Sequence, residues 1–144
     1  MLSLVKSQKY KIKSIIGLAS APDFPKILIW DNLSFLQKKD FIRNKKIILS
    51  KVYDGQKYDY KITFDFIKDA ISNLVMNSKI NFKGKVFLYH GMKDEDVPYE
   101  TSIHISKNIE GAKHVQVILE KNGGHRLSEQ NEINHIKKLI KNSV

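Results

Sequence analysis

The sequence predicts an α/β fold in which three parallel strands are flanked by helices. Two short apolar runs, at residues 86–89 and 115–119, each stop abruptly at a loop, and a third run spans residues 14–21. Apolar runs of this length between turn signals are typical of buried strands in a parallel sheet. Segments with apolar residues at helical spacing separate these runs. Together these patterns predict a layered α/β fold.

The length and composition limit the classes of protein that we consider. The chain has 144 residues, enough for one domain, and 42% of them are hydrophobic, enough for a core. It contains no cysteine, which excludes a disulfide framework and a thiolate nucleophile. We find no secretory leader pattern, and no apolar run has the length of a membrane span. We therefore expect a cytoplasmic protein without a membrane span.

The net charge of +10 has two explanations. A polyanion partner would explain it, but so would ordinary solvated lysines. The lysines are scattered along the chain, and Arg43 and Arg126 are the only arginines, although nucleic-acid readers favour arginine. We therefore expect no nucleic-acid partner.

The first half of the chain contains the less regular elements. Residues 2–10 are predicted to be the tail of a helix, and residues 13–21 form a strand that ends in small side chains. Two prolines make residues 21–25 a loop. Apolar spacing over residues 26–39 predicts one or two short amphipathic helices. They contain Trp30, which is either a core anchor or part of a lid or acyl pocket.

A hairpin and a helix follow. Alternating runs at residues 47–53 and 58–62 flank Asp54 and Gly55, and Asp-Gly between such runs predicts a β-hairpin, with a connection of two residues or more. Helical spacing continues over residues 63–77, with Thr63 as the N-cap.

The second half alternates strands and helices. A strand begins at Lys85, a helix covers residues 99–108 with Gly111 beyond its end, and a second strand covers residues 115–119. The last helix, at residues 129–141, places its apolar residues on one face.

Two residues with catalytic potential follow the last two strands. Asp94 lies in the acidic loop after residues 86–89, and His125 lies in the glycine-containing loop after residues 115–119. Working groups of open α/β sheets lie beyond the carboxyl ends of the strands, so we expect both at one edge. A carboxylate that orients a histidine general base is two thirds of a hydrolytic triad. Asp96 is an alternative acid if the turn is looser, although it also suits a helix N-cap.

The remaining histidines have structural explanations. His90 is either a second catalytic histidine or a residue that fixes the Asp94 loop, and we favour the second. His104, His114 and His135 are interpreted as structural. The five histidines show no metal-ligand spacing, so we expect neither a metal site nor a cofactor.

The chain contains the segments HGMKDEDVP, GGHRLS and IKSIIGLASAPDF. All three resemble segments of α/β-hydrolase serine esterases and thioesterases, the group of palmitoyl-protein thioesterases and acyl-glucuronide esterases. The resemblance implies that Asp94 is the acid, that His125 is the base and that the third segment is the strand after the nucleophile helix. It further implies a partial α/β-hydrolase fold, in which residues 1–144 are the C-terminal part of one incomplete domain. Residues 23–80 then correspond to a lid-like insertion that contains the hairpin, or simply to the crossover between strands.

The chain departs from this family in two places. No serine has the G-x-S-x-G setting of the nucleophile, and Gly124 stands where the family often has Asp. We therefore expect a C-terminal fragment of a hydrolase of carboxylic esters or thioesters that is inactive alone, with the serine on an N-terminal partner fragment. A decayed remnant, with Met1 inside the nucleophile helix, is a second explanation. A non-catalytic basic module that binds a polyanion or a protein is the alternative from another class.

Overall fold

The computed structural model describes residues 1–53 and 55–143. The chain divides into two compact units. The first comprises Met1–Pro22 and Val75–Val144, and the second comprises Asp23–Leu74. Each unit has its own core.

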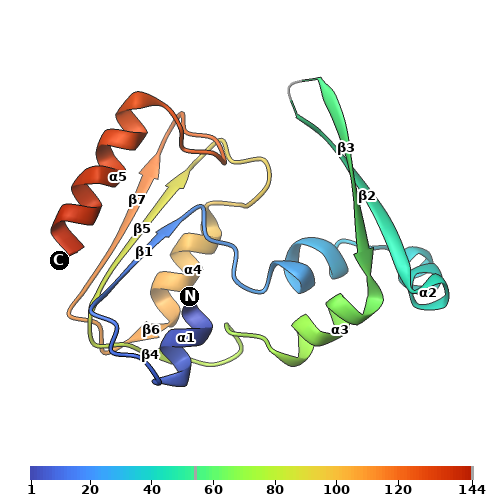
Figure 1. Ribbon diagram of the computed structural model, residues 1–144, viewed down its shortest axis with the longest axis horizontal. Helices are drawn as coiled ribbons and strands as arrows, with labels where there is room; N and C mark the ends of the chain where they lie inside the picture. Colours follow the sequence, from blue (N-terminus) through green and yellow to red (C-terminus); the bar gives the residue numbers. More distant parts are fainter. Residues whose placement is uncertain (54, 144) are drawn as a thin grey trace. The chain divides into compact units, whose positions relative to one another are not determined.

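A three-stranded parallel sheet forms the centre of the first unit, as the sequence predicts (Figure 1). Its strands are β1 (Ser14–Leu18), β5 (Lys85–Gly91) and β7 (His114–Glu120), in the order β1-β5-β7. The central strand β5 is buried from Val86 to Gly91, which explains its continuous apolar sequence. Strand β1 ends earlier than predicted, because Ala19 adopts a positive φ of 42° that an extended strand does not allow.

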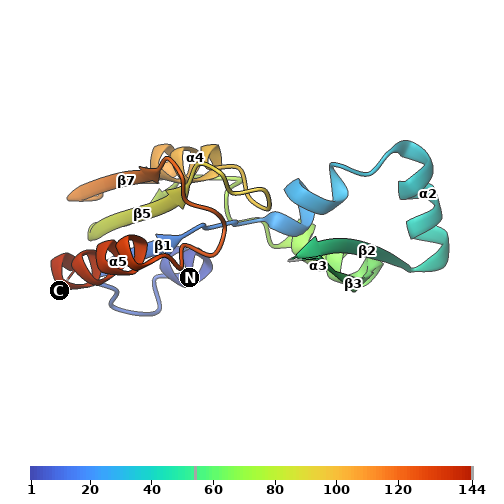
Figure 2. The same ribbon diagram turned by 90° about the horizontal axis from the view of Figure 1, so that it is seen from above.

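Helices cover both faces of this sheet (Figure 2). On one face Val86 and Leu88 pack with Ile105 of α4 (Glu100–Asn108), where α1 (Leu2–Ser7) also packs through Val5. On the other face Phe87 and Tyr89 pack with Leu139 of α5 (Gln130–Ser143). The alternation of side chains along β5 therefore supplies both halves of the core.

A short parallel pair that the sequence analysis missed lies in the same unit. Strand β4 (Ile80–Asn81) pairs with β6 (Ile109–Glu110). Each strand has two residues, which is too short to give a recognisable periodic pattern.

The second unit is built on the predicted hairpin. Strands β2 (Lys46–Tyr53) and β3 (Gln56–Thr63) pair antiparallel, and the turn residue Asp54 lies outside the described residues. The short helices predicted within residues 26–39 correspond to a π-helix, η1 (Pro25–Trp30), and to α2 (Phe35–Asn44), which extends beyond residue 39. Helix α2 begins at Phe35 because the preceding residue, Ser34, forms a capping box with Gln37.

Helix α3 (Phe64–Ser72) starts at the predicted N-cap but ends before residue 77. The Thr63 hydroxyl accepts from the N–H of Phe66 at 3.3 Å. At the other end, the Asn73 amide donates to the carbonyl oxygen of Asp69 at 2.9 Å. Asparagine side chains that bond to the backbone in this way compete with helix continuation.

Trp30 packs in the core of this second unit. Its ring centroid lies 6.3 Å from that of Phe41 and 6.0 Å from that of Phe64. The largely buried cluster around them centres on Phe41 and Ile67. Trp30 is therefore a core anchor in this structure. The lid role that the resemblance implies for residues 23–80 stays a prediction.

Candidate active site

Asp94 and His125 lie in hydrogen-bond contact in the first unit. Asp94 follows β5 and His125 follows β7, so the parallel sheet brings both loops to its carboxyl edge. The Nδ1 atom of His125 lies 2.9 Å from Oδ2 of Asp94. The acid side chain is fully buried, whereas the imidazole is 44% exposed. The buried Asp94 carboxylate accepts a hydrogen bond from Nδ1. Nε2, on the opposite side of the ring, is then available to act on a reacting group.

Backbone N–H groups fix the other oxygen of Asp94. Its Oδ1 accepts from the N–H of Asp96 at 2.9 Å and from that of Val97 at 2.8 Å. Burial alone would raise the pKa of Asp94, but hydrogen bonds from these N–H groups and from His125 outweigh it and hold the pKa below its usual value of 3.8. Asp94 is therefore ionised near neutral pH, as an acceptor for an imidazole must be.

Replacing Asp94 should make stability less dependent on pH. A lowered folded pKa means that the carboxylate stabilises the fold above the unfolded pKa, and that this contribution is lost as the pH falls through the folded pKa. We expect Asp94→Asn to lower the free energy of unfolding near neutral pH, and the difference from wild type to shrink at about pH 3. Urea unfolding of both proteins, near neutral pH and at about pH 3, measures this difference in the free energy of unfolding.

Glu95→Gln is the matched control for this prediction, because Glu95 is an exposed carboxylate in the same loop. It should leave the free energy of unfolding nearly unchanged at both pH values. A deficit in Asp94→Asn that stays constant with pH would contradict the predicted linkage.

His90 contacts the same carboxylate from inside the protein. This contact agrees with the interpretation that His90 fixes the Asp94 loop. It is the sixth residue of β5 and is fully buried. Its Nε2 lies 3.1 Å from Oδ2 of Asp94 and 3.0 Å from the carbonyl oxygen of Val97. Its Nδ1 lies 2.7 Å from the buried hydroxyl of Ser102 on α4.

Close backbone contact holds the two loops together. The N–H of Met92 donates to the carbonyl of Glu120 at 2.8 Å, and the N–H of Lys93 donates to that of Gly123 at 2.9 Å. A Cβ on Gly91 would collide with backbone atoms of Gly123. Glycine at position 91 therefore permits the approach that places Asp94 beside His125.

Tyr89 lies beneath this edge and is not a candidate base. Its hydroxyl lies 3.3 Å from a carboxylate oxygen of Glu120. Burial, followed by the negative charges of Glu120 and Glu132, raises the pKa of Tyr89 to about 12. The phenol therefore stays neutral at physiological pH, and its ring packs against that of His135.

Asp96, the alternative acid, lies close to the pair. One potential ligand atom from each of Asp94, Asp96 and His125 lies within 4.8 Å of the other two. Asp96 does not cap α4, whose N-cap is Tyr99 without a side-chain hydrogen bond. Asp94 and His125 are already hydrogen-bonded to each other, so this geometry gives no separate reason for a metal role.

The chain resembles palmitoyl-protein thioesterase ABHD10, mitochondrial, from rat, at 32% identity over 133 residues. The alignment covers 92% of this chain and 44% of that protein. The structure of alpha/beta hydrolase domain-containing protein 10 from mouse matches 99% of this chain and 56% of that one, with a TM-score of 0.84 and 30% identity. This chain is part of an α/β-hydrolase fold. No family model matches the sequence.

A more distant hydrolase supports the same fold. A putative hydrolase from Agrobacterium vitis S4 matches 99% of this chain and 55% of its own, with a TM-score of 0.83 at 23% identity. The chain thus spans about half the length of its relatives. The resemblance to the thioesterase group and the partial α/β-hydrolase fold, both stated from the motifs, are confirmed.

Cellular location is less constrained than the fold. No described helix combines the length and the apolar character needed to cross a bilayer. The name of the rat protein places that protein in mitochondria. The cytoplasmic location that we expected for this chain stays a prediction.

Sequence reasoning missed two residues of this site. Ser102 contacts His90 across 12 positions of sequence, from a different element, and no spacing rule signals such a contact. Gly91 lies inside the recognised motif, but its close approach to Gly123 depends on how two loops meet. The signal for Gly91 is a glycine at the end of a strand, which often marks close backbone approach.

Proposed function

We propose that this chain supplies the acid and the base of a serine hydrolase that acts on carboxylic esters or thioesters. The observation that carries the proposal is the 2.9 Å contact between Nδ1 of half-exposed His125 and Oδ2 of buried Asp94. It orients the imidazole so that Nε2 is available as general base. The thioesterase name of the rat and mouse relatives supports the substrate class.

In this proposal His125 takes the proton of a serine hydroxyl as the serine attacks the acyl carbon. Asp94 stabilises the imidazolium that forms, and His125 then returns the proton to the leaving group. The chain has no G-x-S-x-G segment, so the serine belongs to other polypeptide. Members of a triad act as a unit, and we expect this chain alone to hydrolyse esters barely above the buffer rate.

The outer edge of β1, unpaired in the described part of the chain, favours a polypeptide partner that adds a strand to the sheet. Among the described residues β1 pairs only with β5, which leaves its outer backbone groups without a strand. Leu18 on this strand is 43% exposed, and a hollow of about 340 Å³ with mostly apolar walls lies alongside. Exposed parallel edges with apolar side chains are uncommon in complete sheets. We propose that the serine-bearing polypeptide extends the sheet here.

Complementation tests this function. The part of the mouse relative that this chain does not match is co-expressed with this chain, and hydrolysis of a p-nitrophenyl acyl ester and of an acyl thioester is measured. We expect hydrolysis from the mixture and none above background from either half. A mixture that assembles into a stable complex but hydrolyses neither substrate would contradict the proposal.

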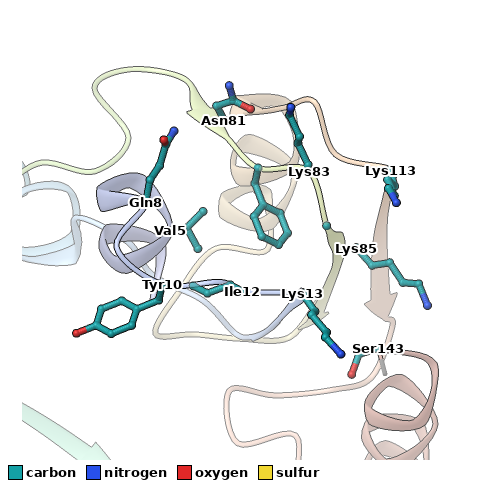
Figure 3. Close-up of a pocket in the computed structure, with 12 residues that line it drawn as sticks. Val5, Gln8, Tyr10, Ile12, Lys13, Asn81, Lys83, Lys85, Lys113 and Ser143 are labelled. Carbon is teal, nitrogen blue, oxygen red and sulfur yellow. The ribbon is translucent and has the colours of Figure 1, made fainter.

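A second candidate function, a basic module that binds a polyanion, rests on a different observation. Lys13, Lys83, Lys85 and Lys113, scattered in sequence, surround one hollow of about 800 Å³ (Figure 3). None of the residues that line this hollow is acidic. It lies where β1, β5 and β7 begin, at the edge opposite the Asp94–His125 pair. Such a concentration of positive charge favours anions.

Heparin chromatography distinguishes polyanion binding at the hollow from retention by net charge alone. If the hollow binds polyanions, Lys13→Gln with Lys113→Gln should elute at clearly lower salt than Lys137→Gln with Lys138→Gln, which removes the same charge from exposed positions of α5. Equal elution of the two double variants would show that retention follows net charge alone.

A further inference from the structure

Two imidazole rings contact the same oxygen of Asp94, and they differ in burial and in the element that carries them. His125 Nδ1 and His90 Nε2 lie 2.9 and 3.1 Å from Oδ2. His90 is fully buried on the central strand, whereas His125 is 44% exposed on a loop. The ring on the rigid element is therefore better placed to fix this oxygen than the ring that acts on the substrate.

The contacts of His90 determine where its proton is. Nε2 faces the carboxylate of Asp94 and the carbonyl oxygen of Val97, and both groups accept hydrogen bonds. Nε2 therefore carries the proton and donates it to both. Nδ1 is then an acceptor, and the Ser102 hydroxyl, 2.7 Å away, donates to it. Every polar atom of this buried ring has a partner of the right kind.

The two oxygens of Asp94 are held by different means. Oδ1 accepts from two backbone N–H groups, those of Asp96 and Val97. Oδ2, among the described residues, is contacted by the two imidazoles. If His90 is removed, the exposed base alone would orient Oδ2, from a loop that contains Gly123 and Gly124. Such an arrangement loses the preorganisation that a base requires.

We infer that His90 is a positioning residue for the acid. Its Nε2–H holds Oδ2 of Asp94 in the direction that His125 requires, and the Ser102 hydroxyl keeps the His90 ring in that tautomer. The inference rests on the proposed function insofar as Asp94 and His125 are the acid and the base. The hydrogen-bond chain itself is a property of this chain and can be measured without activity.

Two substitutions of His90 separate its two contacts. In His90→Gln the side-chain amide reaches the position of Nε2 and can still donate to Asp94. In His90→Asn the shorter amide reaches the position of Nδ1 and retains a contact with Ser102 only. Both variants bury an amide at the same site, so they are matched in polarity.

Long-range ¹H–¹⁵N NMR of the histidine rings at neutral pH is the readout. We expect His125 to carry its proton on Nδ1 in the wild-type chain and in His90→Gln. In His90→Asn we expect a mixture of both His125 tautomers. A merely structural role for His90 would not move the proton of another ring, so an unchanged His125 in His90→Asn would overturn the inference.

The wild-type spectrum gives a second, independent test. The inference requires His90 to carry its proton on Nε2, and a proton on Nδ1 alone would overturn it even if His90→Asn does not fold. A different result separates the two proposals. If wild-type His125 carries its proton on Nε2 while that of His90 is on Nε2 as expected, the proposed function fails and the His90–Asp94 contact stands.

Discussion

His125→Ala should abolish the hydrolysis that complementation restores, with a loss of about 10⁴- to 10⁶-fold in kcat. The substitution removes the group that takes the serine proton, and the remaining members of a triad cannot replace it. Because the His125 side chain is 44% exposed, the loss of its packing should change the free energy of unfolding little. The p-nitrophenyl ester assay of the assembled halves, with binding of the halves measured in parallel, separates lost chemistry from lost assembly.

His104→Ala is the control for this prediction. His104 is exposed on α4 and contributes to neither the Asp94 contact nor the loops around it. Its removal should leave kcat within about twofold of wild type. If His125→Ala retained a tenth or more of the wild-type kcat, His125 would not be the general base.

Gly91→Ala should have the second-largest effect, on both stability and activity. The new Cβ would meet the backbone of Gly123 and the carbonyl oxygen of Gly124, and backbone atoms cannot move aside as the end of a flexible side chain can. We expect a loss of about 1–3 kcal/mol in the free energy of unfolding, typical of overpacking in a well-packed site. Separation of the two loops by even about 1 Å should also cost on the order of 10²-fold in kcat.

Gly124→Ala is the matched control, since a Cβ at Gly124 would meet nothing within 4 Å. It lies in the same loop, one residue before His125, and its φ is not positive. We expect near wild-type stability and activity. If both glycine substitutions had equally small effects, the loops would tolerate separation. If both had equally large effects, the His125 loop would be sensitive for a reason other than the contact at Gly91.

The sequence was sufficient to predict the strands of the sheet and the two residues at its edge. Strand β5 is buried on both faces, so its apolar residues run without interruption and are easy to recognise. Asp94 and His125 could be placed together because parallel strands end at a common edge, and the resemblance assigned a role to each.

The features that the sequence did not predict depend on contacts between distant segments. The π-helix η1 differs from an α-helix in hydrogen-bond register, which apolar spacing does not reveal. Ser102 is one of several polar residues on α4, and the contact with His90 appears only once the helix packs on the sheet. The cluster of Lys13, Lys85 and Lys113 also forms only when three strands begin side by side, so the scattered lysines of the sequence gave no sign of it.

The position of the His125 ring proton decides whether His125 and Asp94 form an acid–base pair. Long-range ¹H–¹⁵N NMR of the wild-type chain near neutral pH, with Asp94→Asn as reference, measures it. We expect a proton on Nδ1, donated to Asp94, with Nε2 unprotonated, and loss of that preference in Asp94→Asn. A His125 ring that carries its proton on Nε2, or a spectrum unchanged by Asp94→Asn, would contradict this pairing.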